Sequence, residues 1–551
     1  MIRSKLKHLL DHCFQQGVEQ GLWSAAAAGL YNLETPRHDG QGDFATNFAM
    51  IVAGKERRTP REVAEQLTRL LRQDTTLIDK VEIAGPGFVN CFINPAVWSS
   101  ALAPIAAQQE CFGLSELGKG VKVMVEFVSA NPTGPLSVGH GRNAVLGDAV
   151  ARLLIAVGYN VTREYYFNDA GRQMRVLGAS LCARYRERLG LPNEFPEDGY
   201  QGDYMYDIAQ GMIDEAGDSF KDAELNIFKQ RAQEAIFADI DTTLKRIGII
   251  FDSYYNEHDL YENGLIEEVV AALRAKGLVY EQEGATWFKT TEFGQAQDRV
   301  IIKNTGEPTY RLPDIAYHRE KFRRGFDRMI NVFGSDHIAT VPDVLAGVEA
   351  LGYDKSKVQV IMHQFVTLMR GGKQVKMSTR KATFITVDEL ADEVGTDALR
   401  FFFLMRKPDA QLEFDLELAK AQSQENPVYY VQYAHARLCS IERLAEERGL
   451  ALPEPAQTEL GCLREAEEYQ LLKTLAAYPS LVAEAANDLA PHRIIFFLME
   501  LAGQFHSFYN KHKVMTDDPQ LTAARLCLCK GVKTVLANGL GLVGVTAPER
   551  M

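Results

Sequence analysis

Apolar and polar positions near the start of the chain repeat with two different spacings. Residues 2–28 and 60–73 carry apolar residues at the spacing of amphipathic helices. The stretch LIDKVEIAGPGFVNCFINP alternates apolar and polar residues on both sides of the Gly-Pro-Gly turn at 85–87, which predicts two paired strands. We therefore expect a small α+β domain over 1–110, followed by a turn-rich linker over 109–120.

A different pattern begins after the linker. Valine and phenylalanine alternate with Lys, Met and Glu over 121–127, which predicts a strand. A loop rich in Pro and Gly over 129–141 leads to a helical pattern over 143–157, and a further strand, YNVTREYYF, follows at 159–167. This order of strand, loop, helix and strand is typical of the opening of a parallel, nucleotide-binding sheet.

Helix and strand patterns continue to alternate as far as residue 385, after which helical patterns dominate. The charged, helical segment 185–250 is expected to be an insertion between two halves of the sheet. Further strands of the sheet are predicted at RVIIK (299–303), RMINVF (328–333) and KVQVIM (357–362).

The predicted fold is therefore a multidomain α/β protein. A Rossmann-like parallel-sheet catalytic core occupies 121–390, between the α+β N-terminal domain and an all-α C-terminal domain over 391–551.

Composition narrows the class of protein. The 551 residues are 46% hydrophobic and 24% charged, as in large globular proteins, and disordered or collagen-like chains are excluded. The net charge of −13 excludes a uniformly basic nucleic-acid binder, so any RNA would contact local basic patches.

Cysteine usage and hydropathy indicate a compartment. The eight cysteines are scattered and form no CxxC pair, which favours reduced thiols and argues against zinc. No apolar run approaches the ~18 residues of a membrane span, and the first residues lack the apolar core of a signal peptide. We expect a cytoplasmic protein without a membrane partner.

The loop SANPTGPLSVGHGRN (129–143) is the first candidate for chemistry. Gly139 and Gly141 would let a ligand approach the backbone, and the N-terminus of the following helix would suit a phosphate. His140 is placed to donate a hydrogen bond to that phosphate. The alternative is an ordinary tight turn with a surface histidine.

The second candidate is the segment GGKQVKMSTRKATF (371–384). Two glycines permit a mobile turn, and a cationic loop over a triphosphate would stabilise charge that develops during transfer. The alternative is a solvated basic loop. Its cations and hydroxyl groups are Lys373, Lys376, Ser378, Thr379, Arg380 and Lys381.

Together, in this order, the two segments resemble the HIGH and KMSKR motifs of class I aminoacyl-tRNA synthetases. They read Ser137-Val138-Gly139-His140 and Lys376-Met377-Ser378-Thr379-Arg380. Two positions depart from the motifs. Ser137 replaces the first histidine and carries no charge, and Thr379 removes one cation, which a neighbouring basic residue would have to replace.

The resemblance extends over nearly the whole chain to the bacterial arginyl-tRNA synthetase family. It rests on GDFATNFAM, GPGFVN, VEFVSANPTGPLSVGHGR, YYFNDAGRQM, PTYRLPDIAY, FGSDH, DALRFFFL, NPVYYVQYAHAR, QFHSFYN and the closing APERM. It implies ATP-dependent ligation of L-arginine to tRNA(Arg) through an arginyl-adenylate, releasing AMP and pyrophosphate. It also implies ATP as a substrate with Mg²⁺, tRNA(Arg) as partner and a monomer.

The resemblance also implies residue roles. The catalytic residues would be His140, Gly139, Lys376, Ser378 and Arg380. The ATP-binding residues would be Pro132, Gly134, Ser137, Gly139, His140, Gly141, Asp336, His337 and Met377.

Arginine recognition has a chemical requirement of its own, because a planar guanidinium cation needs a fixed carboxylate. Tyr310 and Asp314 are four residues apart, one helical turn, and would face the same pocket. An exposed helix face is the alternative for this pair. By resemblance, the arginine-binding residues are Glu126, Asn131, His140, Tyr310, Asp314 and His337. Glu126 alternates with the apolar positions of its strand, a pattern that by itself would leave it in solvent.

The C-terminal domain resembles the anticodon-binding domain of the family. Tyr429, Tyr430 and Tyr433 would stack on unpaired bases, although a place in the helix core is the slightly favoured alternative. Lys511 and Lys513 belong to a small basic cluster suited to phosphates.

Two rival functions remain at this point. One is another class I synthetase or adenylate-forming nucleotidyltransferase, and the other is a synthetase-like RNA-binding protein without catalysis.

Overall fold

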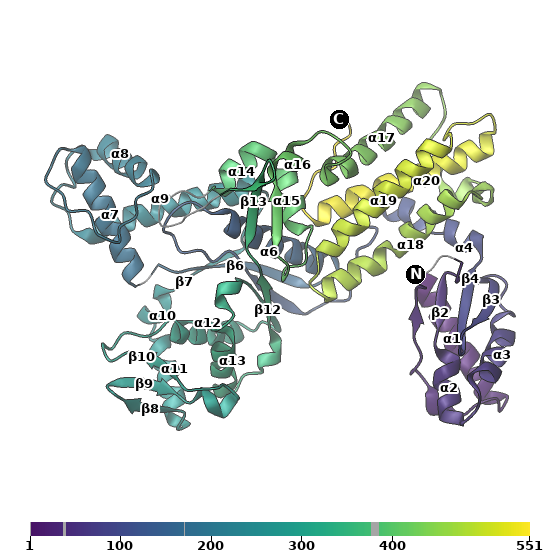
Figure 1. The fold of residues 1–551 in the computed structure, drawn as a ribbon, viewed down its shortest axis with the longest axis horizontal. Coiled ribbons are helices and arrows are strands. Elements are labelled where there is room, and N and C mark those ends of the chain that lie inside the picture. Colours follow the sequence, from purple (N-terminus) through teal and green to yellow (C-terminus); the bar gives the residue numbers. More distant parts are fainter. Residues whose placement is uncertain (1, 37–39, 170, 376–384) are drawn as a thin grey trace.

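The computed structural model describes residues 2–36, 40–169, 171–375 and 385–551. A small N-terminal domain, a central parallel sheet with attached helices and a bundle of long C-terminal helices are visible in Figure 1. The multidomain α/β fold predicted from the sequence is confirmed.

The N-terminal domain is an α+β unit built on an antiparallel sheet of order β1-β2-β4-β3. Its first helix ends at Glu19, nine residues before the predicted end. The chain turns back there through Gly21, which has a positive φ of 69°, and Trp23 packs against Gly17 of the helix. The elements are α1 (Ile2–Glu19), β1 (Leu33–Glu34), β2 (Phe44–Thr46), α2 (Phe48–Glu56), α3 (Pro60–Leu71), β3 (Ile78–Ala84), β4 (Phe88–Ile93), α4 (Pro95–Ser99) and α5 (Leu102–Gln108).

The central sheet has five parallel strands in the order β12-β11-β5-β6-β7. Every residue of β5 after the first is buried, because neighbouring strands and covering helices enclose it on both faces. The alternation predicted to leave Glu126 in solvent therefore does not do so. The strands are β5 (Lys122–Glu126), β6 (Asn160–Phe167), β7 (Ser253–Asn256), β11 (Arg328–Gly334) and β12 (Val358–His363).

The helix after β5 begins earlier than the sequence pattern predicts. Helix α6 runs over Val138–Ala156, so Gly139, His140 and Gly141 lie in its first turn and not in a loop. Ser137 caps this turn, and a serine at the N-cap starts a helix even where glycines weaken the helical pattern. The helix therefore presents its backbone amides directly beside the end of β5.

Two sets of elements extend from the sheet. The insertion between β6 and β7 is helical and projects to the left in Figure 1. Its helices are α7 (Arg172–Arg188), α8 (Tyr204–Ala216) and α9 (Leu225–Arg246). The second set follows β7 and comprises α10 (His258–Glu262), α11 (Leu265–Ala275), β8 (Val279–Gln282), β9 (Ala285–Phe288), β10 (Arg299–Ile302), α12 (Arg311–Arg323) and α13 (Val341–Ala350).

The RVIIK strand, β10, does not join the parallel sheet as predicted. It pairs antiparallel with β9 in a separate three-stranded sheet of order β10-β9-β8. A short apolar run specifies a strand but not its partner, and β9 is the partner nearest along the chain. The predicted strands at 328–333 and 357–362 do belong to the parallel sheet, as β11 and β12.

The C-terminal part is almost entirely helical. Residue 391, the predicted domain boundary, lies within α14, and β15 beyond it still pairs with β13. The elements are β13 (Val366–Arg370), β14 (Lys373–Gln374), α14 (Val387–Val394), α15 (Thr396–Leu404), β15 (Leu412–Asp415), α16 (Leu416–Lys420), α17 (Pro427–Glu447), α18 (Ala466–Asn487), α19 (His492–Lys511) and α20 (Pro519–Leu542).

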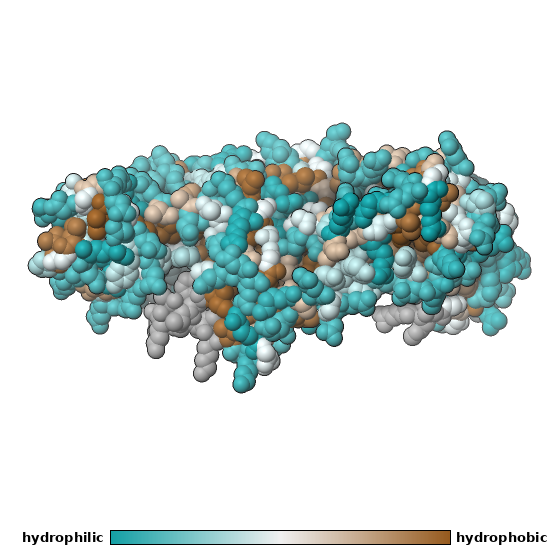
Figure 2. Space-filling model, turned by 90° about the horizontal axis from the view of Figure 1, so that it is seen from above, coloured by the Kyte–Doolittle hydropathy of each residue, from teal (hydrophilic) through white to brown (hydrophobic). Residues whose placement is uncertain are grey.

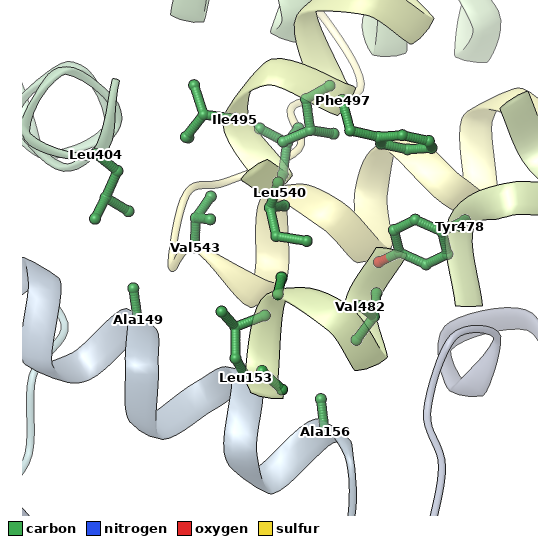
Figure 3. Close-up of a cluster of buried hydrophobic side chains, with 14 of the residues drawn as sticks. Ala149, Leu153, Ala156, Leu404, Tyr478, Val482, Ile495, Phe497, Leu540 and Val543 are labelled. Atoms are coloured by element: carbon green, nitrogen blue, oxygen red, sulfur yellow. The ribbon is translucent and has the colours of Figure 1, made fainter. Parts of the chain in front are cut away.

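One hydrophobic core joins the C-terminal helices to the sheet domain. Ala149, Leu153 and Ala156 of α6 lie against side chains of α15, α18, α19 and α20 (Figure 3). The helix that begins at the candidate site is thus packed directly against the C-terminal helices.

The surface is mostly hydrophilic on the face drawn in Figure 2, with hydrophobic residues in smaller patches. None of the helices that the structure describes is long and apolar enough to cross a bilayer.

Candidate active site

The candidate site lies at the carboxyl ends of β5 and β11. The chain proceeds from β5 through α6 to β6 on one side, whereas β11 pairs with β5 on the other side. Ligands of open parallel sheets bind at such a point, where the strand order reverses.

The backbone is strained where β5 ends. Val128 and Ser129 have φ values of 65° and 42°, a region that residues with a Cβ rarely adopt. The side chain of Asn143, on α6, holds this bend because its Oδ1 accepts a hydrogen bond from Val128 N at 2.6 Å. Its Nδ2 donates to the carbonyl of Val332 on β11 at 2.9 Å. Strain of about 1–3 kcal/mol per residue persists only where surrounding contacts enforce it, as at a binding site.

His140 is fixed within the first turn of α6. The backbone N–H of Ser137 donates to His140 Nδ1 at 3.3 Å, which leaves the proton of a neutral ring on Nε2. Burial lowers the pKa of His140, and the charge of Asp336 opposes this only in part. A neutral imidazole with its proton on Nε2 is a hydrogen-bond donor suited to a phosphate oxygen. Ser137 therefore has a structural role as the helix cap.

The second predicted motif falls on residues 376–384, so Lys376, Met377, Ser378 and Arg380 lie outside the described residues. The segment that follows them is described. Val387 N donates to the carbonyl of Leu136 at 2.8 Å, and Val138 N donates to that of Ile385 at 3.4 Å. The chain immediately after the second motif is thus paired with the chain at the start of the first.

The glycines of the first motif differ in what lies next to them, at the place that a Cβ would occupy. A Cβ at Gly141 would lie 2.9 Å from Val387 and 3.2 Å from Phe403, both buried. The space that we expected for a ligand is therefore filled by packing of α6 on α14 and α15. At Gly139 the nearest atom would be Ser137 Oγ at 3.7 Å. A Cβ at Gly134 would lie 3.1 Å from the ring of Tyr204.

The other predicted ATP residues lie on either side of this helix start. Asp336 and His337 directly follow β11 and are exposed. The His337 ring stacks on Phe333, with centroids 5.2 Å apart. Pro132, in the loop after β5, is buried.

Glu126 is buried and paired. Its Oε2 lies 2.5 Å from Lys321 Nζ, and its Oε1 accepts from Ser129 Oγ at 3.1 Å. Both side chains are almost completely excluded from solvent, with exposed fractions of 4% for Glu126 and 0% for Lys321. Glu126 thus faces into the site from the end of the central strand.

Asp314 and Tyr310 begin α12 but lie in different surroundings. Asp314 is half-buried, and burial followed by the charges of Glu126 and Glu257 raises its pKa to about 8, against the opposing effect of Lys321. Tyr310 is 59% exposed, and its ring lies 4.8 Å from the Arg311 guanidinium. Of the two, Asp314 is the one beside Glu126.

Asn131 lies on the rim of the site. It is exposed, and its Nδ2 donates to Gln173 Oε1 on α7 at 2.8 Å.

Three family models match the chain in succession. They are the arginyl tRNA synthetase N terminal domain at residues 4–93, the catalytic domain of class I tRNA synthetases (R) at 104–420, and the DALR anticodon binding domain at 431–551. An arginine–tRNA ligase of Desulfotalea psychrophila is 62% identical over all of both chains. The chain belongs to the arginyl-tRNA synthetase family.

Other members agree in sequence and structure. An arginine–tRNA ligase of Syntrophotalea carbinolica is 49% identical over 100% of this chain and 99% of its own. A solved structure assigned as an arginyl-tRNA synthetase of Campylobacter jejuni has a TM-score of 0.77 and 32% identity, covering 83% of this chain and all of its own. The Thermus thermophilus arginyl-tRNA synthetase shares the fold over the full length of both chains, with a TM-score of 0.76 and 22% identity.

Membership establishes the reaction. The chain is an arginine–tRNA ligase of class I, which uses ATP to attach arginine to tRNA(Arg). Both rival functions considered from the sequence are thereby excluded.

Four further residues of the site were not found from the sequence. Lys321, His318 and Asn331 connect to Glu126 by hydrogen bonds, and Glu257 accepts from the Tyr166 hydroxyl at 3.1 Å. Burial raises the pKa of Glu257. Isolated polar residues on helices and strands give no local signal of their partners.

The residues predicted to contact tRNA are on the C-terminal helices. Tyr429 and Tyr433 of α17 are half-buried and stacked, with ring centroids 6.0 Å apart, and Tyr433 Oη accepts from Arg437 at 2.7 Å. These two side chains are therefore neither fully buried in the helix core nor fully exposed to solvent. Lys511 pairs with Glu467 at 2.5 Å, so the basic cluster that includes the exposed Lys513 is partly neutralised.

Proposed function

We propose that the edge between β5 and β11 holds both small substrates, arginine on the side of α12 and ATP on the side of α6. The strongest support is the separation of charge at this edge. Asp314 and Glu257 contribute carboxyl groups on one side, whereas the start of α6 contributes backbone amides and the neutral His140 on the other. A cation and a polyphosphate would thus find complementary surroundings next to each other.

The arginine subsite is assigned to Glu126 and Asp314, with Tyr310, Asn131, His140 and His337 around them. Among the described residues, no group donates a hydrogen bond to the Asp314 carboxylate. A carboxyl group left without a partner in a half-buried site is a natural counter-ion for a guanidinium, which offers two parallel donors.

The ATP subsite is assigned to the start of α6. His140 Nε2–H and the amides of the first turn would bind phosphate oxygens, and Gly139 leaves that surface open. Pro132, Gly134, Ser137 and Gly141 would shape the subsite, with Asp336 and His337 at its rim. Lys376, Met377, Ser378 and Arg380 would approach from the other side, because Val387 and Ile385, just beyond them, pair with the chain at Ser137. Mg²⁺ would accompany the phosphates.

The reaction would proceed in two transfers. An oxygen of the arginine carboxylate attacks the α-phosphorus of ATP, the bond to the β-phosphate oxygen breaks, and pyrophosphate leaves. A terminal ribose hydroxyl of tRNA then attacks the activated carbonyl, loses its proton and expels AMP. The protein positions the two anions and offsets their charge, a contribution typically worth 10²–10³ in rate for each donor.

The tRNA would reach the site across the helical C-terminal domain. The stacked Tyr429 and Tyr433 offer π-faces for unpaired bases, and Lys511 and Lys513 offer charge for phosphates. The N-terminal domain would contact the outer corner of the tRNA. We further propose that the synthetase acts as a monomer in the cytoplasm.

Replacement of Asp314 tests the arginine subsite. We expect Asp314→Ala to abolish measurable arginine binding and to leave ATP binding within about twofold, because only the counter-ion of the guanidinium is lost. Calorimetric titration with each ligand separates the two affinities. Tyr310→Phe is a matched variant, expected to have a smaller effect on arginine because Tyr310 is 59% exposed. Unchanged arginine affinity in Asp314→Ala would refute the subsite.

A further inference from the structure

Lys321 is a cation enclosed within the protein. Its side chain has no exposed surface, and Nζ lies 2.5 Å from Glu126 Oε2, 2.9 Å from Asn331 Oδ1 and 4.3 Å from the centroid of the Tyr317 ring. A carboxylate, an amide oxygen and an aromatic face thus surround the ammonium. Burying a charge costs several kcal/mol even when it is paired, and an apolar side chain would fill such a space as well. The presence of a lysine therefore calls for a reason other than packing.

A chain of hydrogen bonds leads from this lysine to the start of α12. Asn331 Nδ2 donates to His318 Nε2 at 2.8 Å, and His318 Nδ1–H donates to the backbone carbonyl of Asp314 at 2.8 Å. Both ring nitrogens of His318 are satisfied only if the ring is neutral. Burial, reinforced by the charge of Lys321, lowers the pKa of His318 to about 3, which keeps it neutral.

This series of hydrogen bonds leaves Glu126 and Asp314 in different states. Both oxygens of Glu126 are occupied, by Lys321 and by Ser129, so its charge is compensated within the protein. Asp314 is held through its backbone, and no donor to its carboxylate is found among the described residues. Glu126 is thereby paired within the protein, whereas the carboxyl group of Asp314 is left to a ligand.

We propose that Lys321 is a positioning residue of the arginine subsite. Its ammonium neutralises and orients Glu126 at the end of β5. Through Asn331 and His318 it also fixes the turn of α12 that presents Asp314. Lys321 touches neither substrate and acts through these partners. The inference rests on the proposed arginine subsite and adds a residue that determines its charge and shape.

A second ion pair between α12 and the same sheet supplies a matched control. Arg324, directly after α12, donates to Glu164 Oε2 on β6 at 2.5 Å, and Glu164 is fully buried. Arg324→Met and Lys321→Met each remove a cation that faces a buried carboxylate from the C-terminal end of α12 or directly after it. Of the two cations, only Lys321 is connected to Asp314 through the hydrogen bonds of Asn331 and His318.

The first experiment compares these two variants in tRNA charging by the full-length enzyme. We expect Lys321→Met to raise the KM for arginine at least about tenfold, with the KM for ATP within about twofold. Arg324→Met is expected to lower stability in urea while leaving the KM for arginine within about twofold. Equal changes in both variants, or an equal rise in the two KM values of Lys321→Met, would overturn the role of Lys321.

The second experiment tests whether Lys321 acts through Glu126. In a Glu126→Gln background the charge that Lys321 compensates is absent, so adding Lys321→Met should raise the KM for arginine less than about twofold further. This double variant buries no unpaired charge and therefore remains testable if Lys321→Met alone does not fold. Multiplicative effects of the two changes would contradict the proposal.

The proposed arginine subsite and the proposed role of Lys321 are refuted by different results. If Asp314→Ala leaves arginine affinity unchanged, the subsite itself is misplaced. If Asp314→Ala abolishes binding and Lys321→Met has no selective effect on arginine, the subsite stands and only the role of Lys321 is refuted.

Discussion

At the scale of single residues, arginine recognition at the proposed subsite would depend on the charge of Asp314. Its pKa of about 8 means that, without a ligand, the carboxyl group is mostly protonated at pH 7. A guanidinium remains charged throughout this range, so its binding favours the ionised carboxylate and expels the proton. The groups whose charges act on Asp314, or that share a charge interaction with it, are Glu126, Glu257, Lys321, Tyr166 and Tyr261.

Arginine affinity should therefore rise with pH. Below pH 8 the slope approaches about tenfold per pH unit, and above pH 8 it levels off because the carboxyl group is already ionised. Calorimetry in buffers of different ionisation enthalpy should also detect the release of nearly one proton per arginine at pH 7. Tyr310→Phe, which keeps the carboxyl group of Asp314, serves as the control and should retain both effects. Constant affinity between about pH 6.5 and pH 8.5 would contradict this assignment of charge.

The site residues were predictable from the sequence to unequal degrees. Motif resemblance pointed to Glu126, Asp314 and His140, and the structure brings Glu126 beside Asp314 and fixes His140 at the start of α6. The pattern of the strand alone would have placed Glu126 in solvent, since alternation does not reveal that a central parallel strand is covered on both faces. Lys321 and Asn331 meet only through the tertiary fold, so nothing local in the sequence signals their pairing.

At the scale of elements, α6 combines a first turn that we propose to face ATP with a tightly packed face. Gly139 and Gly141 are two residues apart and so point in different directions around the helix. Within the part of the chain that the structure describes, Gly139 is open, whereas Gly141 lies against Val387 and Phe403. The sequence suggested the same role for both glycines, and their packing assigns them different roles.

Alanine at each position should separate these roles. Gly141→Ala forces a methyl group against two buried side chains and should cost about 1–3 kcal/mol of unfolding free energy. Gly139→Ala meets no close neighbour among the described residues, so we expect stability to be kept or slightly raised, while ATP-dependent activity falls because the methyl group occupies the open surface. Urea denaturation and pyrophosphate exchange measure the two effects. Equal losses of stability would argue against this division.

Helices and strands were predictable where the periodic pattern is long. They were less predictable where a short segment takes its structure from the strand or helix that it packs against. The pattern over 121–127 identified β5, and the long helical runs identified most helices. The start of α6 was placed five residues too late because glycines weaken the helical signal, although Ser137 is a sound cap. The RVIIK strand was assigned to the wrong sheet because four residues do not specify a partner.

At the scale of the whole molecule, the guanidinium of Arg400 joins three parts of the chain. On α15 and fully buried, it donates to Asp148 of α6 at 2.5 Å. It also donates to the carbonyl of Val543, after α20, at 3.0 Å and to that of Ile247, after α9, at 2.8 Å. Helix α6, the C-terminal helices and the insertion are therefore all linked by hydrogen bonds to this one guanidinium. They are also joined by the continuous core of Figure 3.

Loss of Arg400 should consequently weaken the whole assembly. Arg400→Met leaves two buried carbonyl groups without this donor and removes a buried partner of Asp148, for an expected loss of about 3–5 kcal/mol. Arg152 also pairs with Asp148, at 2.7 Å, but its side chain is 32% exposed, so Arg152→Met should cost less than about 1 kcal/mol. Urea denaturation gives both values, and similar small losses in the two variants would show that Arg400 does not hold the three parts together. Because α6 also carries His140, we expect Arg400→Met to lower the rate of arginine activation even where the protein remains folded, whereas Arg152→Met should retain it.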